Sequence, residues 1–557
     1  MEKSFMINCR EEVLHLTKEL VSIRSIVNTE GESIIAHSLY QMVSSYPYFK
    51  DNPGNVVIEK TINDERDRYN VLAYVKGTKG NSNRTVIIMG HMDTVGVDDF
   101  NQQEDYAFKP DEWMELLKHE DVSDAVRNQL NPNEWLFGRG ALDMKSGVAS
   151  NLFLLKFFSE HPDILDGNLV FIAECDEEDG SHGILSALTT LKNWKVDYEF
   201  DYVAAINADF VAPLYEGDPN RYIYKGTVGK LLPAFYIAGE ETHVGAPFKG
   251  FDPNLIAAEL TRQISYNPEL CNLALGEYTL PPVALKQMDL KTEYTVQTAL
   301  GAYVYYNFLI HSWTPKEALA ILKEHAEIAF QHALELFENR YRAFCKLSGE
   351  AYNGIQWKPR VITYEEMENM LVKAHGSDYV DSMNQFKQDL LRDDSLDTRM
   401  YALKVVEEAW KWMEDKNPTI ILFYSSLYYP RIELSGKTLN EQVLSEALDE
   451  AVDVIQSQYK KPIKVKNFFP FISDMSFMSL SDDEAAIQAV KDNNPAWGTK
   501  HFVDYDLIRD INVPVINIGP YGMDGHKKLE RVEIDYSMEL VPNMTKLVIE
   551  KVLSHNK

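Results

Sequence analysis

The stretch Asn168-Leu-Val-Phe-Ile-Ala-Glu-Cys-Asp-Glu-Glu-Asp-Gly-Ser-His-Gly183 decides how we interpret the chain. It begins as a mostly apolar strand and runs directly into clustered acidic residues and a glycine-containing turn. Open α/β sheets hold their functional sites at the carboxyl ends of their strands. Neighbouring residues that leave a strand point in different directions, so we expect Glu177 and Glu178 to differ in role, one moving a proton and the other binding a cation. The ordinary alternative is a solvated acidic turn.

Other metal-ligating residue types stand at the ends of predicted elements in the same way. Apolar strands precede His91, Asp209 and His526, and Asp143 stands before an apolar helix. Together with Glu178, these residues form a candidate ligand set of imidazole and carboxylate without thiolate, which suits Zn, Co or Mn. With one carboxylate shared, the set suffices for two metal ions roughly 3.5–4 Å apart.

Each of these five residues, taken alone, has an ordinary structural explanation. A single histidine is more often a hydrogen-bonded structural residue, and a single loop aspartate is more often a turn former or a helix cap. Five independent coincidences at element ends are harder to accept than one shared site. We therefore expect a centre for two divalent metal ions, with zinc favoured and cobalt or manganese as alternatives.

Composition limits the class of protein and its partners. The chain has 557 residues, too many for one ordinary domain, so we expect two or more. A formal net charge of −30 argues against nucleic acid or an anionic membrane surface as a partner. The four cysteines are scattered, which suits a reducing compartment. No secretory signal and no run near the ~18 apolar residues of a membrane helix stand out, so we expect a cytoplasmic protein.

The order of strands and helices predicts the α/β class. Through residue 221 strands alternate with helices, which indicates a mostly parallel sheet with helices on both faces. The order of strand and helix patterns then changes, and residues 222–345 are predicted to form a smaller, inserted α/β domain. Residues 346–417 carry amphipathic helical patterns that we interpret as an extra helical lid or, alternatively, as a packed appendage. The metal-binding catalytic domain is then discontinuous, comprising residues 1–221 and 418–557.

Longer motifs surround the candidate ligands. They are Gly90-His-Met-Asp93, Gly138-Arg-Gly-Ala-Leu-Asp-Met-Lys-Ser-Gly147, Asp176-Glu-Glu-Asp-Gly-Ser-His-Gly183 and Gly239-Glu-Glu-Thr-His-Val-Gly-Ala-Pro247. In this order they resemble the M20 metallopeptidase/amidohydrolase family, and the resemblance covers nearly the whole chain. The unusual length and the helical insertion make the chain look most like a branch of that family linked to arginine utilisation.

The resemblance implies a role for each candidate ligand. His91 and Asp209 would hold one metal ion. Glu178 and His526 would hold the other, and Asp143 would bridge the two ions.

The resemblance also implies which residues move protons and stabilise charge. Asp93 would orient His91, and Glu177 would be the general base that takes a proton from water and returns it to the leaving amine. His243 would stabilise the developing oxyanion; in dimeric relatives this histidine reaches the neighbouring subunit's site. Its alternative explanation is a hydrogen-bonded turn histidine. Family members also usually carry a cis peptide bond at the position of Asp143–Met144.

The sequence motifs point to fewer residues for substrate binding than for metal binding. Ser473 and Asp474 stand where relatives carry a short polar motif near the substrate, and a plain loop cap is the equal alternative. Relatives that bind a substrate α-carboxylate carry an arginine in a late strand of the second domain, where this chain has Leu309. An apolar side chain cannot donate the pair of hydrogen bonds with which an arginine holds a carboxylate. The substrate carboxylate is therefore bound elsewhere, or the substrate lacks one at this position.

These observations predict a two-metal enzyme that hydrolyses an amide bond in a small N-acyl amino acid or short peptide, with a link to arginine catabolism implied by the resemblance. The alternative is an inactive family member that binds a metabolite or a partner; the intact ligand set and Glu177 argue against it. A nucleophilic Ser or Cys hydrolase is disfavoured, because no Gly-x-Ser-x-Gly motif occurs and acids beside Cys175 would raise its pKa. The family resemblance implies either a homodimer or a lid-covered monomer.

Overall fold

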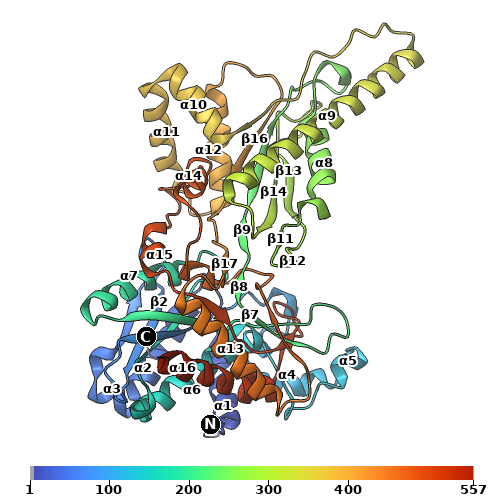
Figure 1. Cartoon of the computed structure of the whole chain (residues 1–557). Helices are drawn as coiled ribbons and strands as arrows, with labels where there is room; N and C mark the ends of the chain where they lie inside the picture. The colour runs from blue at the N-terminus through green and yellow to red at the C-terminus, as the bar shows by residue number, and fades with distance from the viewer. Residues whose placement is uncertain (1–5, 556–557) are drawn as a thin grey trace. The chain divides into compact units, whose positions relative to one another are not determined.

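The computed structural model describes residues 6–555. The chain divides into two compact units. The first unit comprises Met1–Thr227, Ile432–Leu480 and Asp504–Lys557, and the second comprises Val228–Arg431 and Ser481–Val503. Each unit has its own sheet and its own hydrophobic core, and Figure 1 labels some of the elements of both.

The main sheet of the first unit has the strand order β1-β2-β5-β3-β6-β19-β7-β18. These strands are β1 (Val56–Lys60), β2 (Tyr69–Lys76), β3 (Arg84–His91), β5 (Asn168–Glu174), β6 (Asp201–Asn207), β7 (Arg221–Tyr224), β18 (Ile463–Lys466) and β19 (Val515–Asn517). In the centre, β3 pairs in parallel with β5 and β6, and β6 pairs in parallel with β19. The carboxyl ends of these four strands therefore meet at one edge, which confirms the predicted α/β sheet.

Helices cover this sheet. They include α1 (Arg10–Ser22), α2 (Gly31–Ser45), α6 (Ser146–Glu160), α7 (His182–Asp197), α13 (Leu439–Gln456) and α16 (Val541–Ser554). Alternate residues of β3, Val86 and Ile88, share one core with apolar residues of α1, α6, α13 and α16. The apolar side chains of α7 lie outside that core, and α7 packs against β2 and β5. Because both faces of β3 and β5 are buried, these strands read as continuous apolar runs in the sequence.

A small sheet joins distant segments of the first unit. Its strands are β4 (Trp135–Phe137), β20 (Gly522–Met523) and β21 (Arg531–Glu533), in the order β20-β21-β4. All of its pairings are antiparallel. β4 leads into the turn that contains Asp143, and β20 and β21 flank the loop that contains His526. Two predicted ligands that lie far apart in the sequence are thus attached to one sheet.

The sheet of the second unit has the order β13-β14-β10-β16-β15, with β9 paired to β14. Its strands are β9 (Gly229–Leu231), β10 (Pro233–Ala238), β13 (Val283–Asp289), β14 (Gly301–Ile310), β15 (Val361–Thr363) and β16 (Thr419–Tyr424). The helices α8 (Pro253–Ile264) and α9 (Pro315–Ser348) pack against it. The predicted helical insertion is present as α10 (Tyr364–His375), α11 (Ser377–Leu390) and α12 (Thr398–Trp412), which form a core with alternate residues of β10 and β16.

This division differs from the boundary that we predicted at residue 418. β16 pairs with β10 and β15, so it belongs to the sheet of the second unit and not to the catalytic domain. Residues Ser481–Val503, which contain α14 (Glu484–Asp492), also belong to the second unit. A short, fully buried apolar strand carries no local signal for which of two sheets it joins, because the choice depends on pairing with distant segments.

Within residues 6–555, no helix combines the length and the apolar character that a membrane crossing requires.

Candidate metal centre

His91 is the last residue of β3, and its ring is almost completely buried. Its Nδ1 atom lies 3.1 Å from the carbonyl oxygen of Asp93 and 3.6 Å from the Asp93 carboxylate. A proton on Nδ1 that is donated to this carbonyl leaves Nε2 available to accept a cation. Nε2 lies 3.0 Å from Oδ1 of Asp143. The predicted orienting residue is therefore beside His91, and its backbone makes the closer contact.

The carboxylate of Asp93 has a second set of partners. It is fully buried and accepts hydrogen bonds from the backbone N–H groups of Glu177 (3.3 Å) and Glu178 (3.1 Å). One side chain thus contacts the His91 segment and fixes the acidic turn that follows β5. This contact explains how the two glutamates stay in defined positions although the turn contains glycine.

Asp143 lies in a tight turn, Ala141–Lys145, and the peptide bond to Met144 is cis, as the resemblance implied. Its carboxylate faces two imidazole rings. Oδ1 lies 3.0 Å from Nε2 of His91, and Oδ2 lies 2.8 Å from Nε2 of His526. Burial alone would raise the pKa of Asp143, but hydrogen bonds to His526 and His91 hold it below its ordinary value.

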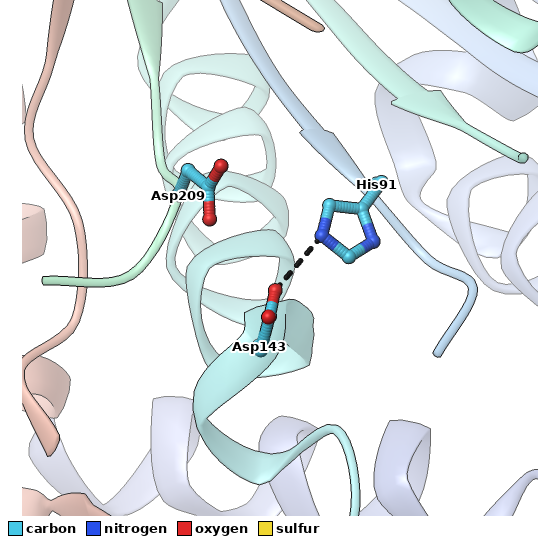
Figure 2. A group of neighbouring side chains, drawn as sticks. All are labelled: His91, Asp143 and Asp209. Atoms are coloured by element: carbon cyan, nitrogen blue, oxygen red, sulfur yellow. Dashed lines mark hydrogen bonds and ion pairs between the residues drawn. The ribbon is translucent and has the colours of Figure 1, made fainter. Parts of the chain in front are cut away.

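Asp209 follows β6 and is buried. Its backbone is held by the side-chain amide of Asn517, which accepts the Asp209 N–H (3.0 Å) and donates to the Asp209 carbonyl (2.8 Å). Its carboxylate turns toward the space beside His91 and Asp143 (Figure 2). Burial and the negative charge of Asp143 raise the pKa of Asp209 to about 7.

Glu178 and His526 form the other side of the cluster. Oε1 of Glu178 lies 3.1 Å from Nε2 of His526, the same nitrogen that faces Asp143. His526 has a positive φ of 62° and its side chain is 49% exposed, which makes it the most accessible of the five candidates. Burial favours its neutral ring, but the carboxylates of Asp143 and Glu178 raise the pKa of His526 to about 11.

The structure brings all five predicted ligands together. His91, Asp143 and Asp209 place ligand atoms within 4.8 Å of one another, and so do Asp143, Glu178 and His526. Asp143 belongs to both groups. Carboxylates gathered this closely repel one another unless cations lie between them, and burial together with this repulsion raises the pKa of Asp209 and Glu178. Imidazole and carboxylate donors in this arrangement fit a pair of divalent metal ions.

Glu177, the predicted base, lies at the rim of this cluster. Its Oε2 atom is 3.9 Å from Nε2 of His91. Burial is the main cause that raises the pKa of Glu177 well above its ordinary value, and the charges of Asp474 and Glu178 raise it further. A carboxyl group with a raised pKa is suited to accept and return a proton near neutral pH.

The remaining predicted residues lie in different places. Ser473 and Asp474 are both 1% exposed and lie beside the cluster, where the Ser473 hydroxyl accepts a hydrogen bond from Asn207 (2.8 Å) and also contacts the Asp209 carboxylate. Burial raises the pKa of Asp474 well above its ordinary value. His243 belongs to the second unit and is exposed. Leu309 is buried in β14 of the same unit.

Sequence reasoning missed residues that hold the ligands in place. Glu530 accepts hydrogen bonds from the backbone N–H groups of Leu142 (3.1 Å) and Asp143 (3.2 Å), and Asn517 holds Asp209. Glu530 lies four residues after His526, yet nothing in the local sequence marks it as buried. The backbone N–H groups of the Asp143 turn need hydrogen-bond acceptors, and this requirement is the signal that could have pointed to a residue such as Glu530.

The sequence profile of Peptidase family M20/M25/M40 matches residues 87–511. This range contains every predicted site residue except His526. The chain belongs to this family and is a metal-dependent peptidase or amidohydrolase.

Individual relatives cover almost the whole chain. Protein RocB of Bacillus subtilis (strain 168) is 36% identical over 548 residues, which are 98% of this chain and 95% of RocB. The uncharacterized protein YqjN of the same organism is 30% identical and covers 98% of this chain and 97% of its own length. The solved M20 family metallo-carboxypeptidase Sso-CP2 of Sulfolobus solfataricus has a TM-score of 0.53 at 14% identity, covers 97% of this chain and 99% of its own, and shares the fold.

Proposed function

We propose that this chain hydrolyses an amide bond in a small N-acyl amino acid or short peptide, with two divalent metal ions. The observation that carries this proposal is the position of the Asp143 carboxylate, whose two oxygens face His91 at 3.0 Å and His526 at 2.8 Å. A carboxylate that presents one oxygen to each of two histidines is suited to bridge two cations.

The donor set suggests how the ions are held. We assign His91 and Asp209 to one ion and Glu178 and His526 to the other, with Asp143 shared. Zinc suits these imidazole and carboxylate donors best, and cobalt or manganese would also fit. When bound, the ions supply a Lewis acid that polarises the substrate carbonyl and lowers the pKa of water toward ~7.

The chain itself supplies the groups that move the proton. We assign Glu177 as the general base, which takes a proton from the attacking water and gives it to the nitrogen of the leaving amine. Its backbone is fixed by the Asp93 carboxylate. Because burial raises its pKa, the carboxyl group can hold the proton that it takes from water until the leaving amine accepts it. The proton that is removed in the first step is the one that the leaving group requires.

His243 is assigned to the stabilisation of the negative charge that develops on the carbonyl oxygen. Its Nδ1 atom accepts a hydrogen bond from the N–H of Gly245 (2.9 Å), so the proton of the neutral ring is on Nε2. Its exposed ring therefore presents a donor, as this role requires. Ser473 and Asp474 are assigned to the substrate side of the centre, where their burial beside Asp209 keeps them in fixed positions.

Further proposals concern the biological setting and the assembly of the protein. We infer a link to arginine catabolism from the resemblance to a branch linked to arginine utilisation. The free cysteines, which suit a reducing compartment, support a cytoplasmic location. For assembly we propose either a homodimer through the second unit or a monomer in which α10–α12 act as a lid. Leu309 at the predicted carboxylate-binding position is consistent with a substrate that lacks a carboxylate there or with a substrate carboxylate that is bound elsewhere.

The experiment that tests the function uses protein purified without chelator. Elemental analysis should find up to two equivalents of transition metal, and N-acyl amino acids and dipeptides should be screened with the Zn-, Co- and Mn-loaded protein. Glu177→Gln should abolish hydrolysis and leave metal uptake largely unchanged. Asp179→Asn, which changes an exposed acid of the same turn, should retain both hydrolysis and metal uptake. Metal-free protein after reconstitution, or an active Glu177→Gln variant, would refute the proposal.

A further inference from the structure

Glu530 lies at the junction of the two segments that carry Asp143 and His526. It directly precedes β21, at the end of the loop that contains His526, and only 1% of its surface is exposed. Its backbone N–H donates to the carbonyl of Lys527 (2.9 Å), which closes the His526 loop. Its carbonyl accepts a hydrogen bond from the N–H of Gly138 (3.1 Å), at the start of the Asp143 turn.

The Glu530 carboxylate continues this connection. Oε1 accepts hydrogen bonds from the backbone N–H groups of Leu142 (3.1 Å) and Asp143 (3.2 Å). Oε2 accepts from Nη1 of Arg139 (2.8 Å). The backbone of the Asp143 turn departs from helical geometry at Asp143 and Met144, and the N–H groups of Leu142 and Asp143 take this side chain as their acceptor.

Arg139 is the counter-ion that makes the burial of Glu530 tolerable. Arg139 is also 1% exposed, and it uses its remaining donors on the Asp99 carboxylate (2.8 Å) and the Gly96 carbonyl (3.1 Å). Removal of one partner of a buried ion pair leaves an uncompensated charge, so the pair acts as a unit. The antiparallel pairing of β21 with β4 gives the same two segments a backbone connection.

From these contacts we propose that Glu530 is a positioning residue that holds the Asp143 turn in register with the His526 loop. It thereby sets the distance between Asp143, the proposed ligand of both metal ions, and His526, a proposed ligand of one of them. Glu530 does not itself touch a cation; it acts through Asp143 and His526. The inference rests on the proposed metal assignment. Of the two ions, the one held by Glu178 and His526 depends most on this distance, because His526 comes from the exposed loop that Glu530 anchors.

The test measures metal binding and does not depend on a known substrate. Glu530→Ala removes the acceptor of both N–H groups, so the affinity for the weaker-binding metal ion should fall about 10–100-fold in chelator competition with zinc. Glu530→Gln keeps one oxygen for those N–H groups and should show a smaller loss. If Glu530→Ala does not fold, circular dichroism will reveal it and Glu530→Gln then carries the test.

Glu533→Gln is the matched control. Glu533 lies on the adjoining strand, is 7% exposed, and pairs with the buried Arg221 (2.8 Å), but it contacts no predicted ligand. Its variant should lose stability and bind both ions as the unmodified protein does. Raising the zinc concentration should restore the second equivalent in Glu530→Gln, which a general loss of folding would not allow.

The outcomes separate this inference from the proposed function. If the unmodified protein binds two ions and the Glu530→Ala or Glu530→Gln variant binds them equally well, only the positioning role is overturned. An equal loss of affinity in Glu533→Gln would also overturn it, because burial of charge would then explain the effect. An unmodified protein that binds no metal ion would overturn both.

Discussion

The backbone N–H of Glu178 donates to the carboxylate of Asp93 at 3.1 Å, so the residue that stands two positions after His91 also anchors the acidic turn after β5. His91 and Glu178 are assigned to different metal ions, and Asp93 is the side chain that connects their segments.

Replacement of Asp93 should therefore affect both the ligands and the base. Asp93→Ala removes the acceptor for the N–H groups of Glu177 and Glu178, and the affinity for metal should fall about 10–100-fold. The rate at saturating metal should fall as well, because Glu177 loses its fixed backbone. Chelator competition and steady-state kinetics measure the two effects. Asp93→Asn, which keeps one acceptor oxygen, should be intermediate; unchanged metal affinity in Asp93→Ala would contradict the assignment.

The stability of the metal-free protein should fall as pH rises. Burial raises the pKa of Glu174 to about 8 and that of Asp209 to about 7, so above pH ~4 the folded protein binds more protons than the unfolded chain, whose carboxyl groups have ordinary pKa values. The free energy of unfolding then decreases with pH until about pH 8. His526, with its pKa raised to about 11, stabilises the fold fully below about pH 6.5 and loses this contribution as pH rises toward 11.

Divalent metal should reverse this trend, because metal ions replace the protons that the cluster otherwise binds. The increase in melting temperature caused by zinc, relative to chelator, should be larger at pH 8 than at pH 6. Differential scanning fluorimetry at the two pH values measures it. An equal or smaller increase at pH 8 would show that Asp209 does not bind the metal.

A methyl group at residue 519 should displace Asp209. The Cβ atom of Gly519→Ala would lie 1.7 Å from the Asp209 carbonyl oxygen, which is incompatible with the present backbone. We expect a loss of stability and of one equivalent of metal, measured by thermal unfolding and elemental analysis. Gly54→Ala is the matched control, because its Cβ atom meets no other atom within 4 Å. Full metal content in Gly519→Ala would mean that the Asp209 position is not required.

Replacement of His243 should separate charge stabilisation from metal binding. His243→Ala should reduce kcat about 100–1,000-fold, which is the usual effect of removing one oxyanion donor, and leave two equivalents of metal in place. Val244→Ala, at an exposed neighbouring position, should retain full activity. An unchanged kcat in His243→Ala would show that His243 is a hydrogen-bonded turn histidine and does not stabilise the oxyanion.

The sequence predicted the features that depend on local pattern. The continuous apolar runs of β3 and β6 each end in a polar residue, so the edge at which His91 and Asp209 lie could be located before the structure was known. The cis bond after Asp143 was implied by the family resemblance and is present. These features are encoded within a few residues of the strand or turn concerned.

Features that depend on distant pairing were not predictable. The apolar residues of β16 fit either sheet, and only its pairing with β10 decides the matter. Glu530 appears in the sequence as an ordinary acidic loop residue, because its burial depends on Arg139, which is far away in the chain. Asn517 likewise acquires its role only when β19 pairs with β6.

The small sheet that joins β4 to β20 and β21 has a consequence for biosynthesis. During translation, a nascent chain that has already made Asp143 cannot fix its turn until residues 522–533 have left the ribosome. A nascent polypeptide that lacks residues 522–533 therefore cannot assemble the proposed metal centre.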